Sequence, residues 1–470
     1  MTYRIPLPVP EITYAQAIEH IKGLVRLGIC PLLETVEEML HELGDPDKHL
    51  TCLQIAGTNG KTSTARYAAA ILAGEGIRTA LYTSPELVHY TERMEIDGLP
   101  VSEELFSLGV AAAREAGERI NARREQEGMR PYDVTEFDTL TVAAMVAFAL
   151  SGVEVAVLEV GMGGRWDATS AVKSIRSVAV TGIDLDHTRI LGDTREQIAA
   201  EKAAVIQAGR TCVLGVGTAM PESVEDVFLQ RAQEQGVTPV LLRADCADDV
   251  RGIVSPGIPR VHQHLPRATF TVAERPTGLG TPLSLVVRTP RATYSSIEAI
   301  RPSYQAANIA CAICLIETFV DHKLDVRALR ESVMACPTPG RFDVVRREPL
   351  ALIDACHNPQ SVRVFLEAIR SMEPEVGRRP TLLCAVLSDK DVDGIVRLLA
   401  PEFPHVVVTS TASHRALAPD RLAQVFRTHG KDPVHVSEDI GGAVEWLADT
   451  PFVACGSITT AGEVAALLRS

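Results

Sequence analysis

The sequence has little of what marks several large classes of protein. Its ten cysteines in 470 residues are too few for a fold built on disulfides. The uncharged run at residues 140–153 holds only 14 residues, with Thr, Ser and Gly among them, whereas a membrane-spanning helix needs roughly 20 apolar residues. The N-terminal residues contain no apolar stretch typical of a secretory signal. We therefore expect a cytoplasmic protein with no membrane partner, in which residues 140–150 form a buried helix.

Positive charge is also scarce. Lys and Arg together number 46 against 60 Asp and Glu, which gives a net charge of −14. Non-specific binding of nucleic acid depends on clustered Lys and Arg that neutralise phosphates, so we expect no nucleic-acid partner. A local basic pocket for a small anion is still compatible with this charge. The hydrophobic share of 46% and the charged share of 23% are typical of a packed globular protein.

Length and periodicity indicate an α/β protein with more than one domain. At 470 residues the chain exceeds the roughly 100–200 residues of one domain. Short β-branched runs alternate with longer helical patterns, which favours parallel sheets. The strands expected in the first part of the chain are residues 50–56, 78–82, 153–160, 177–183, 211–216, 240–243 and 283–287.

A stiff connector divides the chain near residue 337. Residues 336–340 read Cys-Pro-Thr-Pro-Gly, and two prolines with a glycine do not continue a helix or a strand. Beyond the connector a second alternating series begins, with strands expected at residues 351–353, 381–386, 406–409, 434–436 and 452–455. We predict domains over residues 1–336 and 341–470, a linker at 337–340, and a monomer.

One C-x-x-C motif, Cys311 to Cys314, is a candidate redox site. It lies in the apolar run Asn-Ile-Ala-Cys-Ala-Ile-Cys-Leu-Ile, which has a helical pattern. Core packing is therefore the favoured interpretation, and redox chemistry is the alternative.

A glycine-rich loop follows the first expected strand and precedes a helix expected at residues 62–73. It reads Gly57-Thr58-Asn59-Gly60-Lys61-Thr62-Ser63. Glycines allow close backbone approach, N–H groups at the helix start point at an anion, and lysine supplies charge. The common pattern G-x-x-x-x-G-K-[ST] would place glycine where this chain has Ile55. The context still predicts a phosphate-binding loop rather than a tight turn with an incidental lysine.

Three further polar residues follow strands of the same domain. They are Ser84, Glu159 and His187, and glycines 161, 163 and 164 come soon after Glu159. Ligands of open α/β sheets bind beyond the carboxyl ends of the strands, and Mg²⁺ prefers carboxylate and phosphate oxygens. Glu159 suits a magnesium site, whereas a lone serine before proline or a lone histidine is equally consistent with a structural role.

These motifs, with several more in the same order, carry a family resemblance. They include Thr83-Ser-Pro85, Glu159-Val-Gly-Met-Gly-Gly-Arg-Trp-Asp-Ala-Thr169, Asp186-His-Thr188, Gln305-Ala-Ala-Asn308, Pro339-Gly-Arg341 and Asp354-Ala-Cys-His-Asn-Pro359. The chain resembles folylpolyglutamate synthase/dihydrofolate synthase of the Mur ligase superfamily. The resemblance implies a larger N-terminal P-loop domain that binds ATP and folate and a smaller C-terminal Rossmann-like glutamate ligase domain.

The resemblance also implies the reaction and its residues. A folate or dihydropteroate carboxylate takes the γ-phosphoryl group of ATP, and the amine of L-glutamate then displaces phosphate. Catalytic roles fall to Lys61, His187, Lys202 and Arg341, with Lys202 carbamylated. Magnesium ligands are Ser84, Glu159 and His187. ATP contacts are Gly57, Thr58, Asn59, Gly60, Lys61, Thr62, Ser63, Asn308, Arg341, Asp354 and His357. Substrate contacts are Thr135, Glu136, Phe137, Arg165, Trp166, Asp167, Ala168 and Arg415, and glutamate is expected near His357, Ser388 or Arg415.

Four positions depart from the family pattern. Thr62 replaces a glycine, as in the peptidoglycan Mur ligases, and Cys356 and Ala204 replace an alanine and a glycine. Thr135 stands where an aromatic ring is expected to face the pterin, a flat group that stacks on rings. Trp166 is a candidate to compensate, and core packing is its alternative role. Without the resemblance, a solvated charge or an ion pair with Glu201 would be the favoured interpretation of Lys202.

Two other functions stay open at this point. One is a Mur-type ligase acting on a UDP-muramoyl peptide, which Thr62 favours slightly. The other is a nucleotide-binding regulatory protein without turnover, which the presence of Glu159 and Arg341 disfavours. The folate reading leads because Glu159 to Thr169 and Leu191 to Thr194 match the folate enzymes.

Overall fold

The structure is a computed structural model that describes residues 3–24, 32–245 and 264–469. The chain folds into two compact units. Unit 1 comprises Met1–Thr271, Leu285–Ile297 and Gln305–Cys336, and unit 2 comprises Val272–Ser284, Glu298–Tyr304 and Pro337–Ser470. The division predicted at residues 337–340 differs from this grouping, because it assigns residues 272–284 and 298–304 to the first domain.

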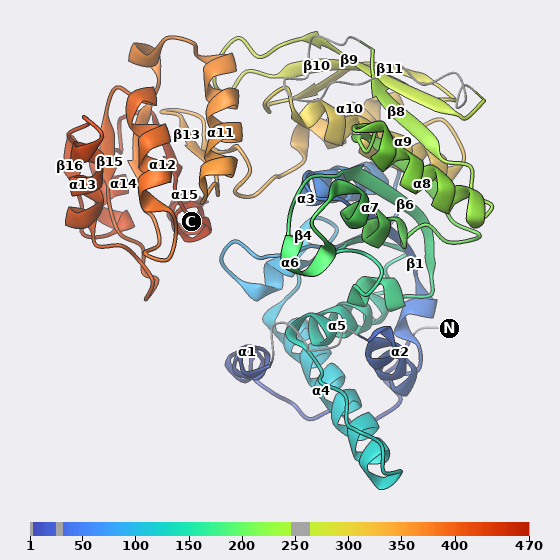
Figure 1. Ribbon diagram of the computed structural model, residues 1–470. Coiled ribbons are helices and arrows are strands. Elements are labelled where there is room, and N and C mark those ends of the chain that lie inside the picture. The colour runs from blue at the N-terminus through green and yellow to red at the C-terminus, as the bar shows by residue number, and fades with distance from the viewer. Residues whose placement is uncertain (1–2, 25–31, 246–263, 470) are drawn as a thin grey trace. The chain divides into compact units, whose positions relative to one another are not determined.

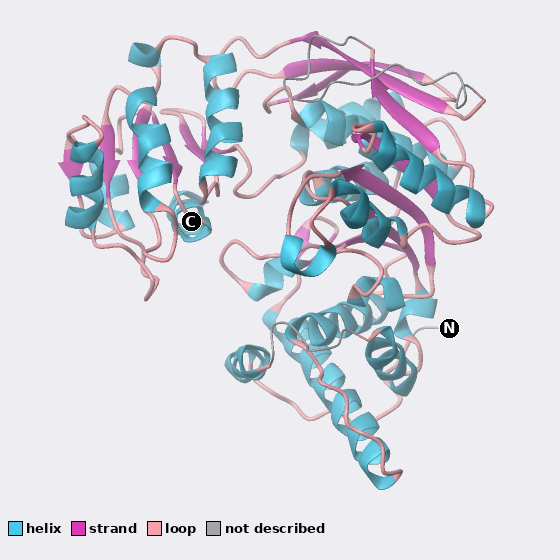
Figure 2. Ribbon diagram, viewed as in Figure 1, coloured by secondary structure: helices cyan, strands magenta, loops and turns pink. Residues whose placement is uncertain are grey.

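An eleven-stranded sheet of mixed direction is formed by the described part of the chain before residue 300 (Figures 1 and 2). Its order is β11-β10-β9-β8-β7-β6-β1-β5-β2-β3-β4. The strands are β1 (Thr51–Ala56), β2 (Thr79–Tyr82), β3 (Met94–Ile96), β4 (Leu99–Pro100), β5 (Val155–Glu159), β6 (Ile175–Gly182), β7 (Thr211–Gly217), β8 (Val240–Ala244), β9 (Arg267–Glu274), β10 (Leu283–Arg288) and β11 (Thr293–Ala299).

The central strands are parallel and buried on both faces. Strand β1 pairs in parallel with β5 and β6, and β2 pairs in parallel with β5. Four of the six residues of β1 are apolar, and Cys52 to Ala56 are all buried. Near-continuous apolar runs are typical of strands covered by helices on both sides. The parallel sheet expected for this domain is thus confirmed, although the antiparallel edge β3–β4 was not expected.

Helices cover both faces of this sheet. On one side α3 packs against α9 and α10, and on the other α5 packs against α2 and α4. The helices of unit 1 are α1 (Tyr14–Gly23), α2 (Leu33–Glu42), α3 (Lys61–Gly74), α4 (Glu103–Gln126), α5 (Glu136–Leu150), α6 (Thr188–Leu191), α7 (Arg195–Ala203), α8 (Glu222–Glu234), α9 (Gln305–Val320) and α10 (Val326–Ala335), with short 3-10 turns η1 (Pro46–His49), η2 (Tyr90–Arg93) and η3 (Ala168–Ala171).

Two predictions about apolar helices are confirmed. Helix α5 contains residues 140–150, where a buried helix was expected, and is buried along nearly its whole length. Cys311 and Cys314 lie buried in α9, and neither forms a disulfide. Across the described ranges, no helix is both long enough and apolar enough to span a bilayer.

Unit 2 holds a six-stranded sheet in the order β12-β13-β17-β14-β15-β16. All pairs are parallel except β12–β13. Its elements are β12 (Asp343–Arg346), β13 (Ala351–Ile353), α11 (Pro359–Met372), η5 (Val376–Arg378), β14 (Thr381–Cys384), α12 (Val392–Leu399), η6 (Ala400–Glu402), β15 (Val406–Val408), α13 (Pro419–Thr428), β16 (His435–Val436), α14 (Ile440–Trp446), β17 (Phe452–Cys455) and α15 (Ile458–Arg469). The sequence predicts five of these strands, and β12 is the one it misses.

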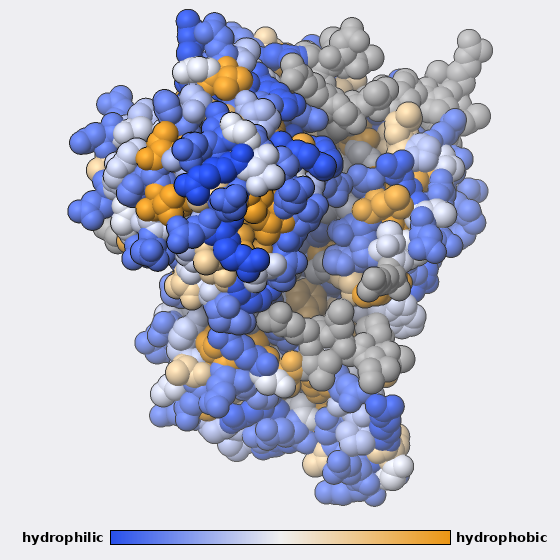
Figure 3. Space-filling view, turned by 60° about the vertical axis from the view of Figure 1, so that its left-hand side comes forward, coloured by the Kyte–Doolittle hydropathy of each residue, from blue (hydrophilic) through white to orange (hydrophobic). Residues whose placement is uncertain are grey.

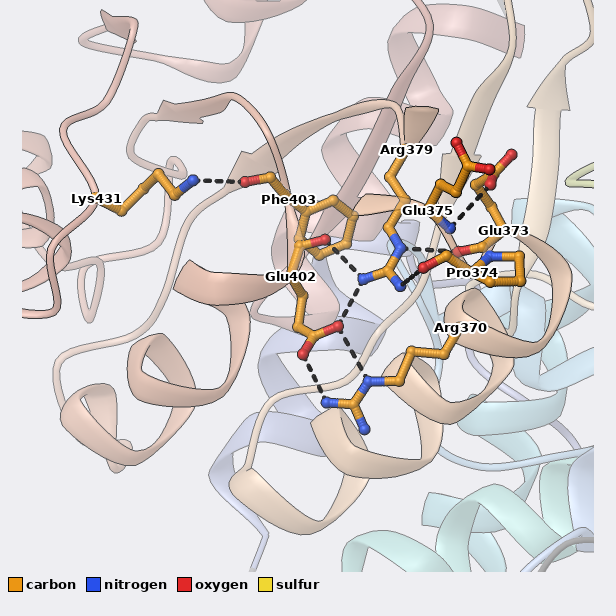
Figure 4. Close-up of polar contacts among 8 residues, drawn as sticks. All are labelled: Arg370, Glu373, Pro374, Glu375, Arg379, Glu402, Phe403 and Lys431. Carbon is orange, nitrogen blue, oxygen red and sulfur yellow. Dashed lines mark hydrogen bonds and ion pairs between the residues drawn. The ribbon is translucent and has the colours of Figure 1, made fainter. Parts of the chain in front are cut away.

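The surface and the core follow the expected division of residue types. On the face drawn in Figure 3, hydrophobic residues reach the surface in small groups between hydrophilic ones. Inside unit 2, a polar network joins the end of α11 to η6 through Arg370, Arg379 and Glu402 (Figure 4). Hydrogen bonds between charged groups are stronger than those between neutral ones, so this network adds to the apolar packing of the same elements.

Candidate active site

The carboxyl ends of four neighbouring strands carry the predicted site residues of unit 1. The strands lie in the order β6-β1-β5-β2 and run in parallel. At or just beyond their ends lie His187, the glycine-rich loop, Glu159 and Ser84, one group for each strand. Parallel strands end at one edge of the sheet, so residues far apart in sequence meet there.

The glycine-rich loop runs from the end of β1 into helix α3. Gly60 precedes the helix with a φ of 84°, and Gly57 has a φ of 147°, values that favour glycine. The Thr58 N–H donates to the Gly182 carbonyl at 2.7 Å. Lys61, the first residue of α3, donates from Nζ to the Thr58 carbonyl at 3.2 Å. A loop of this form at a helix N-terminus offers N–H groups and a cation to a phosphate.

Glu159 lies against the start of this helix. Its Oε1 accepts a hydrogen bond from the Thr62 hydroxyl at 2.8 Å, and its Oε2 accepts one from the Ser84 N–H at 3.3 Å. The Glu159 side chain is nearly inaccessible, with 2% exposed. Thr62, the departure from the family pattern, thus supplies a hydroxyl next to the strand-end carboxylate.

His187 lies on a separate loop after β6. It has a φ of 49° and precedes α6, and its ring lies 3.6 Å from the Asp186 carboxylate. Its side chain is 52% exposed. The structure therefore brings Glu159 and Ser84 into contact and places His187 at the same sheet edge on an open loop, so its role as a metal ligand stays a prediction.

Lys202 is buried on helix α7 with 4% of its surface exposed. Ile198 and Ala199 in the same helix, and Val205 and Ile206 just after it, are fully buried. Burial, with a smaller contribution from the positive charge of Lys61, lowers the pKa of Lys202 to about 8 against the opposing effect of Asp186 and Asp167. Because Lys202 is buried, it is not the solvated charge that was one alternative, and Glu201 pairs with Arg165 at 3.0 Å.

The loop after Glu159 packs directly on α7. A Cβ added at Gly164 would lie 3.0 Å from Val205 and 3.2 Å from the Lys202 carbonyl, so a larger residue there would crowd the end of α7. Asp167 and Ala168 are buried, and the Asp167 carboxylate accepts from Thr169 N–H at 3.1 Å and Met162 N–H at 2.9 Å. Asp167 therefore holds the loop together, whereas Trp166 is half-exposed and is not the core residue that was its alternative role.

The segment predicted to face the pterin begins helix α5. Thr135 caps the helix by accepting from the Asp138 N–H at 3.1 Å. Glu136 is buried and accepts from Arg93 Nη2 at 3.4 Å. Phe137 packs on Tyr82 with ring centroids 5.8 Å apart, and a Cβ added at Gly161 would meet its ring at 2.7 Å. Thr135 is thus explained by helix capping, and Phe137 brings an aromatic ring next to the loop that follows Glu159.

Two residues that the sequence prediction did not assign also contact the phosphate loop. Thr181 Oγ1 donates to the Asn59 carbonyl at 2.6 Å. Gln305 Nε2 donates to the Ser63 hydroxyl at 3.2 Å, and its Oε1 accepts from Asn308 at 2.8 Å. Asn308 itself lies against Gly60, because a Cβ there would come within 2.3 Å of its Oδ1. Within unit 1, the predicted ATP contact Asn308 is therefore beside the loop.

In unit 2, Asp354 follows β13 and organises the linker. Its Oδ2 accepts from the Phe342 N–H at 2.9 Å and its Oδ1 from the Cys356 N–H at 2.9 Å. Burial raises the pKa of Asp354, while the charge of Arg341 opposes that rise. The Nδ1 atom of the neighbouring His357 lies at hydrogen-bond distance, 2.9 Å, from the Ala355 carbonyl oxygen. These contacts gather Arg341, Asp354 and His357 at one end of the sheet.

The remaining predicted residues of unit 2 lie on two adjoining loops. Arg415 pairs with Asp389 at 3.2 Å, and the Ser388 N–H donates to the Arg415 carbonyl at 2.8 Å. Arg415 is about half exposed. Ser388 and Arg415, both suggested for glutamate, therefore lie together after β14 and β15.

The residues of unit 1 fit a nucleotide phosphate with a small, hard cation. The described residues hold no group of three His, Cys, Asp or Glu side chains suited to a metal ion. The donor set is instead one carboxylate with hydroxyls, Glu159 with Thr62 and Ser84. Mg²⁺ is usually bound by one or two carboxylates together with phosphate oxygens and water, and the phosphate loop adjoins Glu159.

Known families match most of the chain. The Mur ligase middle domain matches residues 55–241, and the Mur ligase glutamate ligase domain matches residues 340–451. A Mycobacterium tuberculosis protein named dihydrofolate synthase/folylpolyglutamate synthase is 32% identical over 453 residues, which cover 93% of this chain and 87% of the relative. The chain belongs to the folylpolyglutamate synthase/dihydrofolate synthase family of Mur ligases.

Another relative of this family is longer than the chain. A Haloferax volcanii protein, named probable bifunctional folylpolyglutamate synthase/dihydropteroate synthase, is 33% identical over 436 residues. The match covers 93% of this chain but 47% of that relative, so the chain spans about half of its length.

Solved structures of the family share the fold. Mycobacterium tuberculosis folylpolyglutamate synthase, complexed with ADP and AMPPCP, matches with a TM-score of 0.77 and 29% identity over 97% of this chain and 98% of its own. A bifunctional folylpolyglutamate synthase/dihydrofolate synthase with Mn, AMPPNP and L-glutamate bound matches with a TM-score of 0.71 and 27% identity over 98% and 100%. The expected architecture of two α/β domains is confirmed.

Proposed function

We propose that the protein is an ATP-dependent ligase that adds L-glutamate to a folate or to dihydropteroate, releasing ADP and phosphate. One observation carries the proposal. The phosphate loop and the strand-end carboxylate Glu159 meet through Thr62 at the sheet edge where ligands of this fold class bind. The names of the relatives support a folate acceptor over a UDP-muramoyl peptide.

The chemistry needs positioning and charge neutralisation more than proton transfer. The acceptor carboxylate oxygen forms a bond to the γ-phosphorus of ATP as the bond to ADP breaks. The glutamate amine then attacks the acyl carbon, phosphate leaves with the bonding electrons, and the amine proton passes to solvent. Lys61 and the N–H groups of residues 57–63 hold the phosphates. Glu159, with Ser84 and His187, would hold Mg²⁺, which neutralises the phosphate charge when bound.

Lys202 enters the proposal as a carbamylated residue. Carbon dioxide reacts with a neutral amine, and burial supplies one by lowering the lysine pKa to about 8. The carbamate would exchange a cation near Lys61 for an anion, which could pair with that lysine and with a bound metal ion. The buried position on α7, next to the loop that follows Glu159, supports this role.

The acceptor is placed by the aromatic and half-exposed side chains near Glu159. Phe137 and Trp166 offer ring surface for a pterin, and Arg165 offers a cation. In unit 2, Asp354 is proposed for the ribose, Arg341 and His357 for the nucleotide, and Arg415 for glutamate. The same proposal includes the two predicted domains, one that binds ATP and folate and one that binds glutamate, and a cytoplasmic, monomeric protein.

One assay separates the acceptors. Purified protein is incubated with Mg-ATP, labelled glutamate and either dihydropteroate, tetrahydrofolate or a UDP-muramoyl peptide, and Lys61→Met serves as the inactive control. We expect label in a pterin product and ADP release in the same amount. Label only in the muramoyl peptide would replace the folate proposal with the Mur-type alternative, and ADP release without any ligated product would contradict both.

A further inference from the structure

Thr181, at the end of strand β6, is bonded to the carbonyl side of the phosphate loop. Its hydroxyl lies 2.6 Å from the Asn59 carbonyl oxygen and 3.3 Å from that of Ala56. A hydroxyl has one proton to donate, so the shorter contact is the hydrogen bond. The Thr181 side chain is buried, with 9% of the residue exposed.

The loop makes room for this hydroxyl at Gly57. A Cβ added there would lie 2.0 Å from Thr181 Oγ1 and 3.3 Å from the Gly182 N–H. Any other residue at position 57 would displace the Thr181 side chain. Glycine at the first position of the loop therefore allows the close approach of Thr181 in β6, in addition to the positive φ of position 57.

Two further contacts join the loop to the same strand end. The Thr58 N–H donates to the Gly182 carbonyl at 2.7 Å, and the Thr58 hydroxyl lies 3.2 Å from the Asp184 carbonyl. The other end of the loop is held from α9, where Gln305 contacts Ser63 and Asn308 lies against Gly60. The loop is thus fixed at both ends by polar contacts from segments remote in sequence.

The direction of the loop's peptide groups decides whether it binds an anion. A phosphate is attracted by N–H groups that point at it and repelled by carbonyl oxygens that do. The Thr181 hydroxyl donates to the Asn59 carbonyl oxygen and so keeps that oxygen on the side of the loop that faces β6. We propose that Thr181 is a positioning residue whose hydroxyl sets the Asn59 peptide in the orientation that binds the nucleotide phosphates. The inference rests on the proposed nucleotide site.

The test compares three single variants in the full chain. Thr181→Val has the same shape without the hydroxyl, and Thr181→Ser keeps the hydroxyl. Thr79→Val is a matched control, because Thr79 is buried at the start of β2 and its hydroxyl donates to the Ile77 carbonyl at 2.7 Å. Binding of Mg-AMPPNP is measured by titration calorimetry, and the thermal midpoint of each variant is recorded without nucleotide.

We expect Thr181→Val to weaken Mg-AMPPNP binding about tenfold, the effect of one lost hydrogen bond. Thr181→Ser should stay within about twofold of the parent, and Thr79→Val should bind like the parent even where its thermal midpoint falls. Equal binding by the parent and Thr181→Val, or a failure of Thr181→Ser to preserve binding, would overturn the inference.

Two outcomes outside this scheme are also decisive. If Thr181→Val does not fold, Thr181→Ala replaces it, and equal affinity of the Ala and Ser variants counts against a role for the hydroxyl. If the parent itself does not bind Mg-AMPPNP, the proposed function fails. If instead the parent binds Mg-AMPPNP and the Thr181 variants bind it equally well, only the inference on Thr181 is wrong and the proposed function stands.

Discussion

At the scale of single residues, the proposed chemistry depends most on the charge of Glu159. Glu159→Gln keeps an oxygen that accepts from Thr62 but removes the negative charge that attracts Mg²⁺. We expect turnover to fall about a thousandfold or more at saturating nucleotide, with the thermal midpoint nearly unchanged. Glu154→Gln, an exposed glutamate that precedes the same strand, is the matched control and should keep full activity. Near-normal turnover of Glu159→Gln at high magnesium would contradict the assignment.

Lys202 gives a prediction about pH and carbon dioxide. With a pKa of about 8, the amine is ~10% neutral at pH 7, against ~0.03% for an ordinary lysine. The neutral fraction rises with pH and levels off above the pKa. In enzyme first depleted of carbon dioxide, the rate of reactivation at fixed dissolved CO₂ should therefore rise about tenfold per pH unit below pH 7.5 and become flat above pH 8.5.

The modification itself can be observed. Protein equilibrated with ¹³C-bicarbonate should show a carbamate carbon signal in NMR spectra that Lys202→Ala lacks. The Ala variant should be nearly inactive and partly restored by acetate, which supplies a carboxylate in the vacated space. Reactivation that is independent of pH, or a carbamate signal that persists in the variant, would rule out Lys202 as the site.

At the scale of elements, a buried arginine joins α11 to η6 in unit 2 (Figure 4). The Arg379 guanidinium donates to the carbonyls of Glu373 at 2.9 Å and Pro374 at 3.0 Å and to the Glu402 carboxylate at 2.6 Å. Arg370 donates to the same carboxylate at 2.7 Å. Arg379→Met removes a buried partner and should cost about 3 kcal/mol of stability.

The control for this variant is its neighbour in sequence. Arg378 is 70% exposed and pairs with Glu375 at 2.9 Å, so Arg378→Met should cost under about 1 kcal/mol. The chain has two tryptophans, and Trp446 is the one in unit 2. Fluorescence of Trp446 in a Trp166→Phe background therefore follows the unfolding of unit 2 alone. Equal effects of the two substitutions would show that the network does not stabilise α11 and η6.

The same network predicts how stability depends on acid. The hydrogen bonds from Arg370, with those from Arg379, lower the pKa of Glu402 against the effect of its burial. A folded pKa below the unfolded value of about 4.3 means that the carboxylate stabilises the fold at neutral pH. This contribution should disappear as the pH falls below about 4.3 through the lowered pKa. In Glu402→Gln, the Trp446 unfolding curve should change less over that interval than in the parent.

The elements show which features a sequence pattern can predict. Strands β1, β5, β6 and β13 are rich in apolar residues, as is typical of strands covered on both faces, and such segments are visible locally. Strand β12 and the short pair β3–β4 are not visible in this way, because an edge strand forms only where a neighbouring strand offers it hydrogen bonds. At the site, the loop and Glu159 follow from motifs, whereas Thr181 and Gln305 contact loop residues 122 and 242 positions away. Such contacts depend on tertiary folding, which no local pattern encodes.

At the scale of the whole molecule, the two units are joined by more than the predicted linker. The chain leaves unit 1 at residue 272, returns at 285, leaves again at 298, returns at 305 and leaves finally at 337. A change in the relative position of the units must therefore be absorbed by several connections rather than by one proline-rich hinge. The return at Gln305 leads straight into the contacts with Ser63 and Asn308, so one connection ends at the phosphate loop.

The linker residue Arg341 carries the last prediction. Its backbone is fixed by a hydrogen bond from its N–H to the Thr338 carbonyl at 3.0 Å, and its charge acts on Asp354. We predict that its guanidinium contacts the ATP phosphates when the units close over the nucleotide. Arg341→Lys keeps the charge but loses the planar, multi-donor geometry, so turnover should fall about a hundredfold. Arg347→Lys, an exposed neighbour, should behave like the parent.

Small-angle scattering can distinguish closure from a purely local effect. Addition of Mg-AMPPNP should reduce the radius of gyration of the parent and of Arg347→Lys, because closure excludes water from the site. Arg341→Lys should compact less at the same nucleotide saturation, since the contact that holds the closed form is weaker. If Arg341→Lys matches the parent in turnover, in KM for ATP and in compaction, Arg341 is a solvated charge of the linker and the contact that favours closure lies elsewhere.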